Sequence, residues 1–135
     1  RKEHSFPTRR SSDLLAKDKP LVLCFIDPIR EPTKHTLKEF GAMRETYEKW
    51  GGNILMAVPA EKLTEPFSAE KWNLPKQTIV ATDSNGLMEK ILSDTKQQFN
   101  DNLPLIFIVE ANGKITFRSD GYRIGTAELI YKSLQ

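Results

Sequence analysis

The stretch LPLIFIVEANGKITFR, residues 103–118, carries the strongest structural signal in the sequence. Residues 103–109 form a continuous apolar run with proline near its start, where a missing N–H harms a strand least. Asn112-Gly113 is a typical tight-turn dipeptide, and residues 115–118 then alternate between apolar and polar side chains. The stretch predicts a β-hairpin made of one buried strand and one half-buried partner.

Upstream of this hairpin, the sequence predicts a strand–helix–strand unit. Residues 21–26 and 53–58 are short apolar runs, typical of strands buried on both faces of a parallel sheet. Between them, residues 33–50 place apolar side chains three and four positions apart, and two glycines follow. We therefore expect a helix over 33–50 that connects two parallel strands by a right-handed crossover.

The remaining segments predict shorter elements. Residues 60–77 contain two prolines and indicate a turn or short helix, followed by a short edge strand at 78–81 and a short helix at 87–92. A final helix over 126–134 begins at Thr126, whose hydroxyl can cap it. The predicted fold class is α/β, with a central mixed sheet of four or five strands flanked by helices.

The first fourteen residues, RKEHSFPTRRSSDL, differ from the rest of the sequence. They have no apolar centre of the kind a secretory signal needs, and FPTRRSSDL resembles one reading frame of a sequencing-library adapter. We expect residues 1–14 to be an artefactual or disordered tail and residues 15–135 to form one domain. On this interpretation the natural protein continues upstream of Leu15.

Charge and hydropathy exclude two kinds of partner. The tail holds four basic and two acidic residues, so it accounts for the whole formal charge of +2 and leaves residues 15–135 neutral. A neutral domain lacks the basic footprint of a nucleic-acid-binding protein. No apolar run approaches the roughly 18 to 20 residues of a membrane-spanning helix, so we expect no membrane span in this sequence.

The sequence contains a single cysteine, Cys24, and only two histidines, His4 and His35. An intramolecular disulfide is impossible, and a Cys/His zinc site lacks ligands, so we expect no metal and no cofactor. Cys24 lies in an apolar strand and is interpreted as a small buried hydrophobe, with a reactive thiol as the less favoured alternative.

The order of these elements resembles that of the thioredoxin-like superfamily, in particular bacterial envelope redoxins and thiol-disulfide interchange proteins. Residues 20–25 are similar to the strand that precedes the family's active-site loop. The four positions that carry Cys-Gly-Pro-Cys in the family are here Arg30, Glu31, Pro32 and Thr33. Leu103-Pro104 resembles the segment that holds the family's cis-proline.

This resemblance implies a scaffold without its chemistry. Disulfide exchange needs a thiolate at the helix N-terminus and a second thiol to resolve the mixed disulfide. Arg30 cannot act as a nucleophile, and Thr33 is more naturally a helix cap. We therefore predict no catalytic residue and do not expect an enzyme.

Two interpretations of the loop region stay open. Arg30, His35 and Leu103 are candidate binding residues for an anionic or peptide ligand, since the family's backbone before the cis-proline pairs with extended substrate. The favoured alternative is a solvated helix start with no ligand.

The predicted function is a redox-inactive accessory module. We expect it to form the C-terminal part of a larger bacterial envelope or secreted protein, with a protein, a peptide or an adjoining domain of the same protein as partner. A cytoplasmic location is the alternative, because a lone cysteine also fits a reducing compartment. The alternative function is an enzyme related to thiol-disulfide oxidoreductases that uses Cys24 or the loop from Arg30 to His35.

Overall fold

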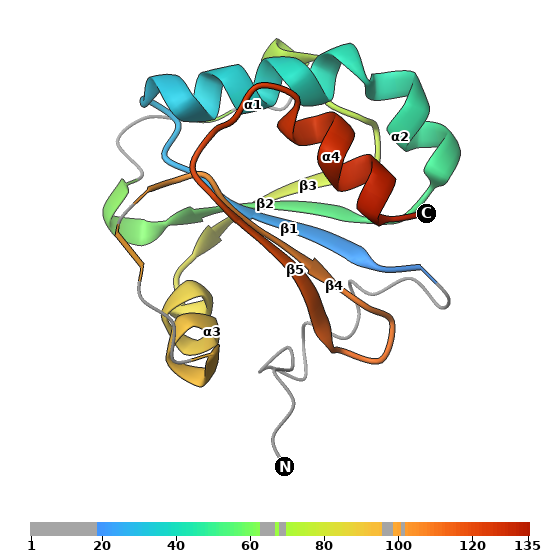
Figure 1. Cartoon of the computed structure of the whole chain (residues 1–135). Coiled ribbons are helices and arrows are strands. Elements are labelled where there is room, and N and C mark those ends of the chain that lie inside the picture. Colours follow the sequence, from blue (N-terminus) through green and yellow to red (C-terminus); the bar gives the residue numbers. More distant parts are fainter. Residues whose placement is uncertain (1–18, 63–66, 68–69, 96–98, 101) are drawn as a thin grey trace.

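Five strands form one mixed sheet at the centre of the molecule (Figure 1). The computed structural model describes residues 19–62, 67, 70–95, 99–100 and 102–135, so the predicted tail and residues 15–18 lie outside it. The strands are β1 (Leu21–Phe25), β2 (Ile54–Pro59), β3 (Thr78–Asp83), β4 (Leu105–Val109) and β5 (Ile115–Asp120).

The sheet order is β3-β2-β1-β4-β5. β1 pairs with β2 in parallel, β2 pairs with β3 in parallel, and β4 runs antiparallel to both β1 and β5. The predicted α/β class, the parallel strand–helix–strand unit and the terminal hairpin are confirmed. The edge strand β3 ends two residues later than its apolar residues indicated.

Helices cover both faces of the sheet (Figure 1). The helices are α1 (Glu31–Ala42), α2 (Arg44–Trp50), α3 (Leu87–Thr95) and α4 (Thr126–Ser133), with short 3-10 turns η2 (Ala60–Lys62) and η3 (Glu70–Trp72). α1, α2 and α4 lie on one face, and α3 lies on the other. No helix in the described ranges is both long enough and apolar enough to cross a membrane.

The single helix predicted over 33–50 is wrong, because the structure divides it at Met43. Gly41 lies just before this break, and a β-carbon on it would come within 2.4 Å of the carbonyl oxygen of Trp72. Glycine is a weak helix former, and here it permits the close approach of η3. The apolar spacing continues through the break, so periodicity alone does not reveal it.

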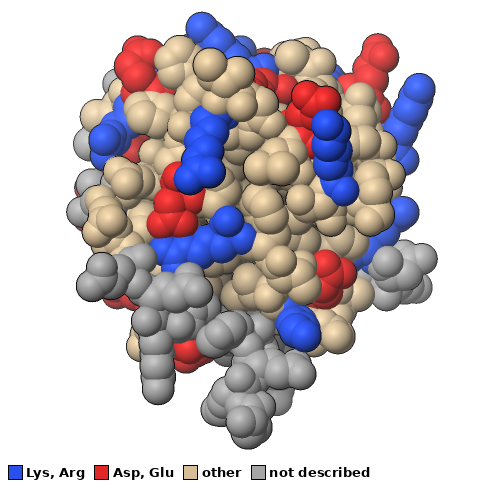
Figure 2. Space-filling view, in the orientation of Figure 1, with Lys and Arg blue, Asp and Glu red and all other residues tan. Residues whose placement is uncertain are grey.

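The strands are buried on both faces, which explains their continuous apolar runs. Along β1, Val22 and Cys24 pack towards α1, α2 and α4, while Leu21, Leu23 and Phe25 belong to the cluster on the α3 side. Figure 2 shows acidic and basic side chains interspersed over the face seen in Figure 1, without a patch of one sign. The loops at the strand ends are therefore held by the packed core. The mixed charges on the face seen in Figure 2 do not indicate a binding site there.

Candidate functional site

The candidate site lies at the edge of the sheet where β1 ends and β4 begins. Phe25, the last residue of β1, is the register partner of Leu105, the first residue of β4. The loop after β1 and the segment before β4 therefore leave the sheet side by side. The peptide bond between Leu103 and Pro104 in that segment is cis.

The Leu103 side chain is 3% exposed and packs in the core cluster on the α3 side. This exposed fraction covers the whole residue, and Pro104 is also buried, so Leu103 itself offers a ligand almost no surface. The carbonyl oxygen of Pro104 accepts a hydrogen bond from the N–H of Gly121 at 2.8 Å. This bond fastens the segment before β4 to the loop that follows β5.

The four positions aligned with the redox motif open α1. Arg30 is the N-cap, with an extended backbone (φ −87°, ψ 144°) and no capping hydrogen bond from its side chain. Pro32 lies in the first turn, where its missing N–H has no intrahelical partner to lose. The prediction that Thr33 caps the helix is wrong, since the helix starts earlier and Thr33 lies inside its first turn.

Thr33 and Asp27 instead organise the loop between β1 and α1. Both side chains are buried, and the hydroxyl of Thr33 accepts a hydrogen bond from the Asp27 N–H at 3.3 Å. The Asp27 carboxylate accepts one from the Ile29 N–H at 3.4 Å, and the Arg30 N–H donates to the Asp27 carbonyl at 3.1 Å. The Asp-Pro dipeptide at 27–28 is the sequence signal for this turn.

His35 contributes to the surface beside this loop. Its ring stacks on Tyr122 from the β5–α4 loop, with centroids 5.2 Å apart and an interplanar angle of 28°. Its Nε2 lies 3.7 Å from the Glu31 carboxylate, one turn away on α1. His35 is therefore a link between α1 and the β5–α4 loop.

Glu39 is the residue that sequence analysis did not identify as important. Its carboxylate accepts hydrogen bonds from the Tyr122 hydroxyl at 2.6 Å and from the N–H groups of Gly125 and Ala127, each at 3.0 Å. Partial burial raises the pKa of Glu39, but these hydrogen bonds together outweigh burial and lower it below its ordinary value. The same contact with Glu39 raises the pKa of Tyr122.

The predicted cap of α4 by the Thr126 hydroxyl is wrong, because the carboxylate of Glu39, on α1, caps this helix. The N-cap of α4 is Gly125, and Thr126 is the first helical residue. The Thr126 hydroxyl turns back to Arg123, accepting from its N–H and donating to its carbonyl oxygen. More than eighty residues separate Glu39 from α4, so no local pattern indicates the contact.

Two exposed isoleucines lie in the loops next to these contacts, one in the loop that leads into α1 and one in the loop that α1 binds. Ile29, in the β1–α1 loop, is 51% exposed, and Ile124, in the β5–α4 loop, is 93% exposed. Side chains of this size are usually buried. These two residues give the site an apolar rim.

No protein-family profile and no curated protein matches this sequence. Solved structures do match. StoA from Bacillus subtilis is 18% identical with a TM-score of 0.62, and the match covers 89% of this protein and 85% of StoA. A thiol:disulfide interchange protein of the thioredoxin family from Chlorobium tepidum is 14% identical, with a TM-score of 0.60 over 92% of this protein and 83% of the other. The exposed lipoprotein thioredoxin Etrx1 from Streptococcus pneumoniae is 20% identical, with a TM-score of 0.57 over 87% of both proteins.

The protein has a thioredoxin-like fold.

The only cysteine of this thioredoxin-like domain is not at the candidate site. Cys24 is fully buried inside β1, as predicted, and burial raises the pKa of its thiol well above the ordinary range. A protonated, inaccessible thiol is a poor nucleophile. Arg30 and Thr33, the residues that the sequence resemblance aligns with the two cysteines of the motif, supply no thiol.

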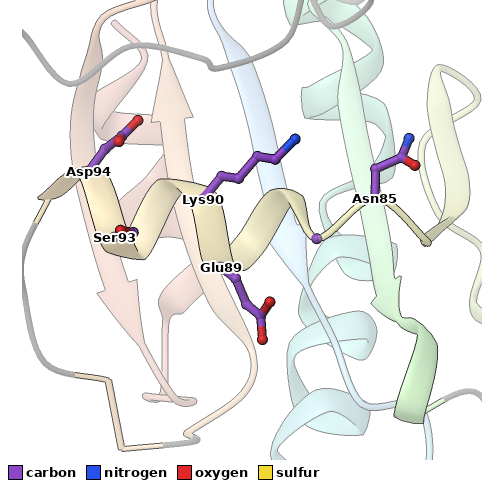
Figure 3. Close-up of a pocket in the computed structure, with 6 residues that line it drawn as sticks. Asn85, Glu89, Lys90, Ser93 and Asp94 are labelled. Atoms are coloured by element: carbon purple, nitrogen blue, oxygen red, sulfur yellow. The ribbon is translucent and has the colours of Figure 1, made fainter.

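The described part of the thioredoxin-like domain contains no group of three or more His, Cys, Asp or Glu residues placed to hold a metal ion. An open hollow of about 400 Å³ runs along α3 (Figure 3), on the face of the sheet opposite α1 (Figure 1). Its Glu89 side chain points away from Lys90 and Asp94, so these groups do not converge on a ligand.

Proposed function

We propose that this thioredoxin-like domain is redox-inactive and binds an extended peptide or protein segment beside its cis Leu103-Pro104 peptide. The proposed lack of redox activity rests on Cys24, which is the only thiol in the sequence and is fully buried. Disulfide exchange requires an accessible thiolate and a second thiol to release the product. The domain has neither.

The binding half rests on the rim of the site. Ile124 exposes apolar surface on the β5–α4 loop, which the Gly121–Pro104 bond ties to the segment before β4 and the Tyr122–His35 stack ties to α1. Ile29 exposes apolar surface on the loop that leads into α1. An extended peptide can lie across these loops at the end of the sheet, where the two apolar side chains supply contact area. The apolar character of Ile29 and Ile124 favours a protein or peptide partner over a small charged ligand.

We infer an accessory role within a bacterial envelope or secreted protein. Support for the location comes from two structural neighbours, which are described as a thiol:disulfide interchange protein and an exposed lipoprotein. Fractionation of the producing bacterium, followed by detection with an antibody against this domain, tests the location. Recovery in the cytoplasmic fraction alone would contradict the inference.

Reductase activity is the direct test of the redox proposal. The domain is expected to show no dithiothreitol-driven reduction of insulin, while Arg30→Cys with Thr33→Cys in the same domain serves as the positive control for the scaffold. Turnover by the natural domain that disappears in Cys24→Ser would refute the proposal. It would instead support the alternative, an enzyme that uses Cys24.

Peptide binding is tested separately by NMR titration with the S-alkylated B peptide of insulin, an unfolded polypeptide that cannot exchange disulfides. We expect saturable amide shifts in the loops around Ile29, Leu103 and Ile124, and weaker binding by Ile124→Ser. Ile79→Ser is the matched control, because Ile79 is an exposed isoleucine on β3 at the opposite side of the sheet. Absence of saturable shifts, or equal weakening by both variants, would contradict the binding proposal.

A further inference from the structure

Two Asn-Gly dipeptides occur in the sequence, and they differ in the hydrogen bonds that their asparagine side chains form in the structure. Asn85-Gly86 lies in the turn between β3 and α3, and Asn112-Gly113 lies in the turn of the β4–β5 hairpin. In an Asn-Gly pair the backbone nitrogen of glycine can approach the preceding side-chain amide, because no β-carbon obstructs it. Both asparagines are exposed, so a difference in their access to water would not explain a difference in their reactivity.

Hydrogen bonds hold the hairpin dipeptide in place. The Asn112 side-chain oxygen accepts the Lys114 N–H at 2.9 Å, and the Gly113 N–H donates to the Glu110 carbonyl at 2.7 Å. A third bond, from the Glu110 N–H to the Lys114 carbonyl at 2.7 Å, closes the turn. Attack by the Gly113 nitrogen on the Asn112 side chain requires the first two bonds to break.

The Asn85 side chain is not held in this way. Within the described ranges, no group forms a hydrogen bond with it. Figure 3 shows it on the turn before α3, apart from the side chains of Lys90 and Asp94. Gly86 adopts a positive φ of 69°, a conformation open to glycine, and the space around it would admit a β-carbon with only the Glu89 carboxylate as a close neighbour at 3.6 Å.

We propose that Asn85 is the preferred deamidation site of this protein. The Gly86 nitrogen loses its proton to solvent and bonds to the carbonyl carbon of the Asn85 amide. The C–N bond of that amide breaks, its nitrogen takes up a proton and leaves as ammonia, and a five-membered succinimide forms. Water then opens the ring to aspartate or isoaspartate, so the net change is water consumed and ammonia released, without oxidation or reduction.

The modification acts on the start of α3. The Asp83 carboxylate caps this helix, accepting the Leu87 N–H at 2.7 Å and the Met88 N–H at 2.9 Å. Isoaspartate at position 85 inserts an extra backbone carbon between the cap and the groups it binds. Because Met88 and Ile91 cover the sheet on the α3 side, loosening the cap weakens the cover of that core cluster.

Mass spectrometry of peptides from aged protein tests the site. After incubation of the folded protein in mildly alkaline buffer, we expect deamidation at Asn85 to be several-fold faster than at Asn112. Asn85→Gln should remove most of the acidic species on ion exchange, whereas the matched Asn112→Gln should leave it. Equal rates at the two sites, or a faster rate at Asn112, would overturn the proposal.

Incubation in urea separates structure from local sequence. Unfolding removes the hairpin bonds, so the preference for Asn85 should shrink towards equality. An undiminished preference in urea would show that neighbouring residues, and not the fold, set the rates. In the isolated isoaspartate fraction, amide hydrogens of Leu87 and Met88 should exchange faster than in fresh protein, and unchanged exchange would refute the effect on the cap.

Discussion

Glu39 joins α1 to the start of α4, and its removal is the sharpest test of how the site is held together. The Glu39→Ala variant deletes the acceptor for the Tyr122 hydroxyl and for the N–H groups of Gly125 and Ala127. Loss of a helix cap typically costs about 0.5 to 2 kcal/mol. Tyr122 lies at the surface, where water replaces the lost partner, so we expect a total loss of about 1 to 2 kcal/mol in the free energy of unfolding.

The stabilisation by Glu39 should depend on pH, because the carboxylate accepts these hydrogen bonds best when it is ionised. Hydrogen bonds hold the folded-state pKa of Glu39 below its unfolded value, so ionised Glu39 stabilises the fold. This contribution is fully present above the unfolded pKa, near about 4.3, and is lost as the pH falls through the lower folded-state pKa. The stability difference between the natural protein and Glu39→Gln should therefore be largest near neutrality and shrink in acid.

Urea unfolding followed by tryptophan fluorescence, at neutral pH and at about pH 3, measures both effects. Glu45→Gln is the matched control, a carboxylate at the start of α2 that is expected to change stability by less than about 0.5 kcal/mol. If Glu39→Ala and Glu45→Gln lower the free energy of unfolding by equally small amounts, the Glu39 carboxylate does not cap α4. If the deficit of Glu39→Gln stays constant into acid, the charge is not responsible.

Further predictions concern the core and the motif. Ile106→Ala, at a fully buried position of β4, should lower the free energy of unfolding by about 2 to 5 kcal/mol, and a loss well under 1 kcal/mol would show that β4 is not central. Arg30→Ala, at an exposed helix start, should change it by less than about 0.5 kcal/mol in the same urea assay. The double variant Arg30→Cys with Thr33→Cys should oxidise to a disulfide under mild oxidant, with the thiol at position 30 ionising below the ordinary value of about 8.5; failure to close the disulfide would mean that the motif is misaligned. Cys24 should react with Ellman's reagent at the global unfolding rate because its thiol is buried, and fast labelling of the folded protein would contradict this.

Sequence alone determined the parts of the fold that depend on local order. Residues buried on both faces of a strand must all be apolar, so the runs in β1, β2 and β4 are visible without any tertiary information. Asn112-Gly113 marks the hairpin because its turn needs residues that accept a positive φ, which Gly113 adopts at 90°. The absence of a second cysteine is likewise a property of composition, and it alone excludes a dithiol site.

Tertiary structure decided the features that depend on residues distant in the sequence. Just before the break at Met43, the Trp72 carbonyl lies against Gly41, about thirty residues earlier in the sequence. The cap of α4 comes from Glu39, and His35 is held by Tyr122, across more than eighty residues in each case. Such contacts form between surfaces that are brought together only when the sheet folds. The sequence does not show whether a polar side chain will bind water or the end of a distant helix.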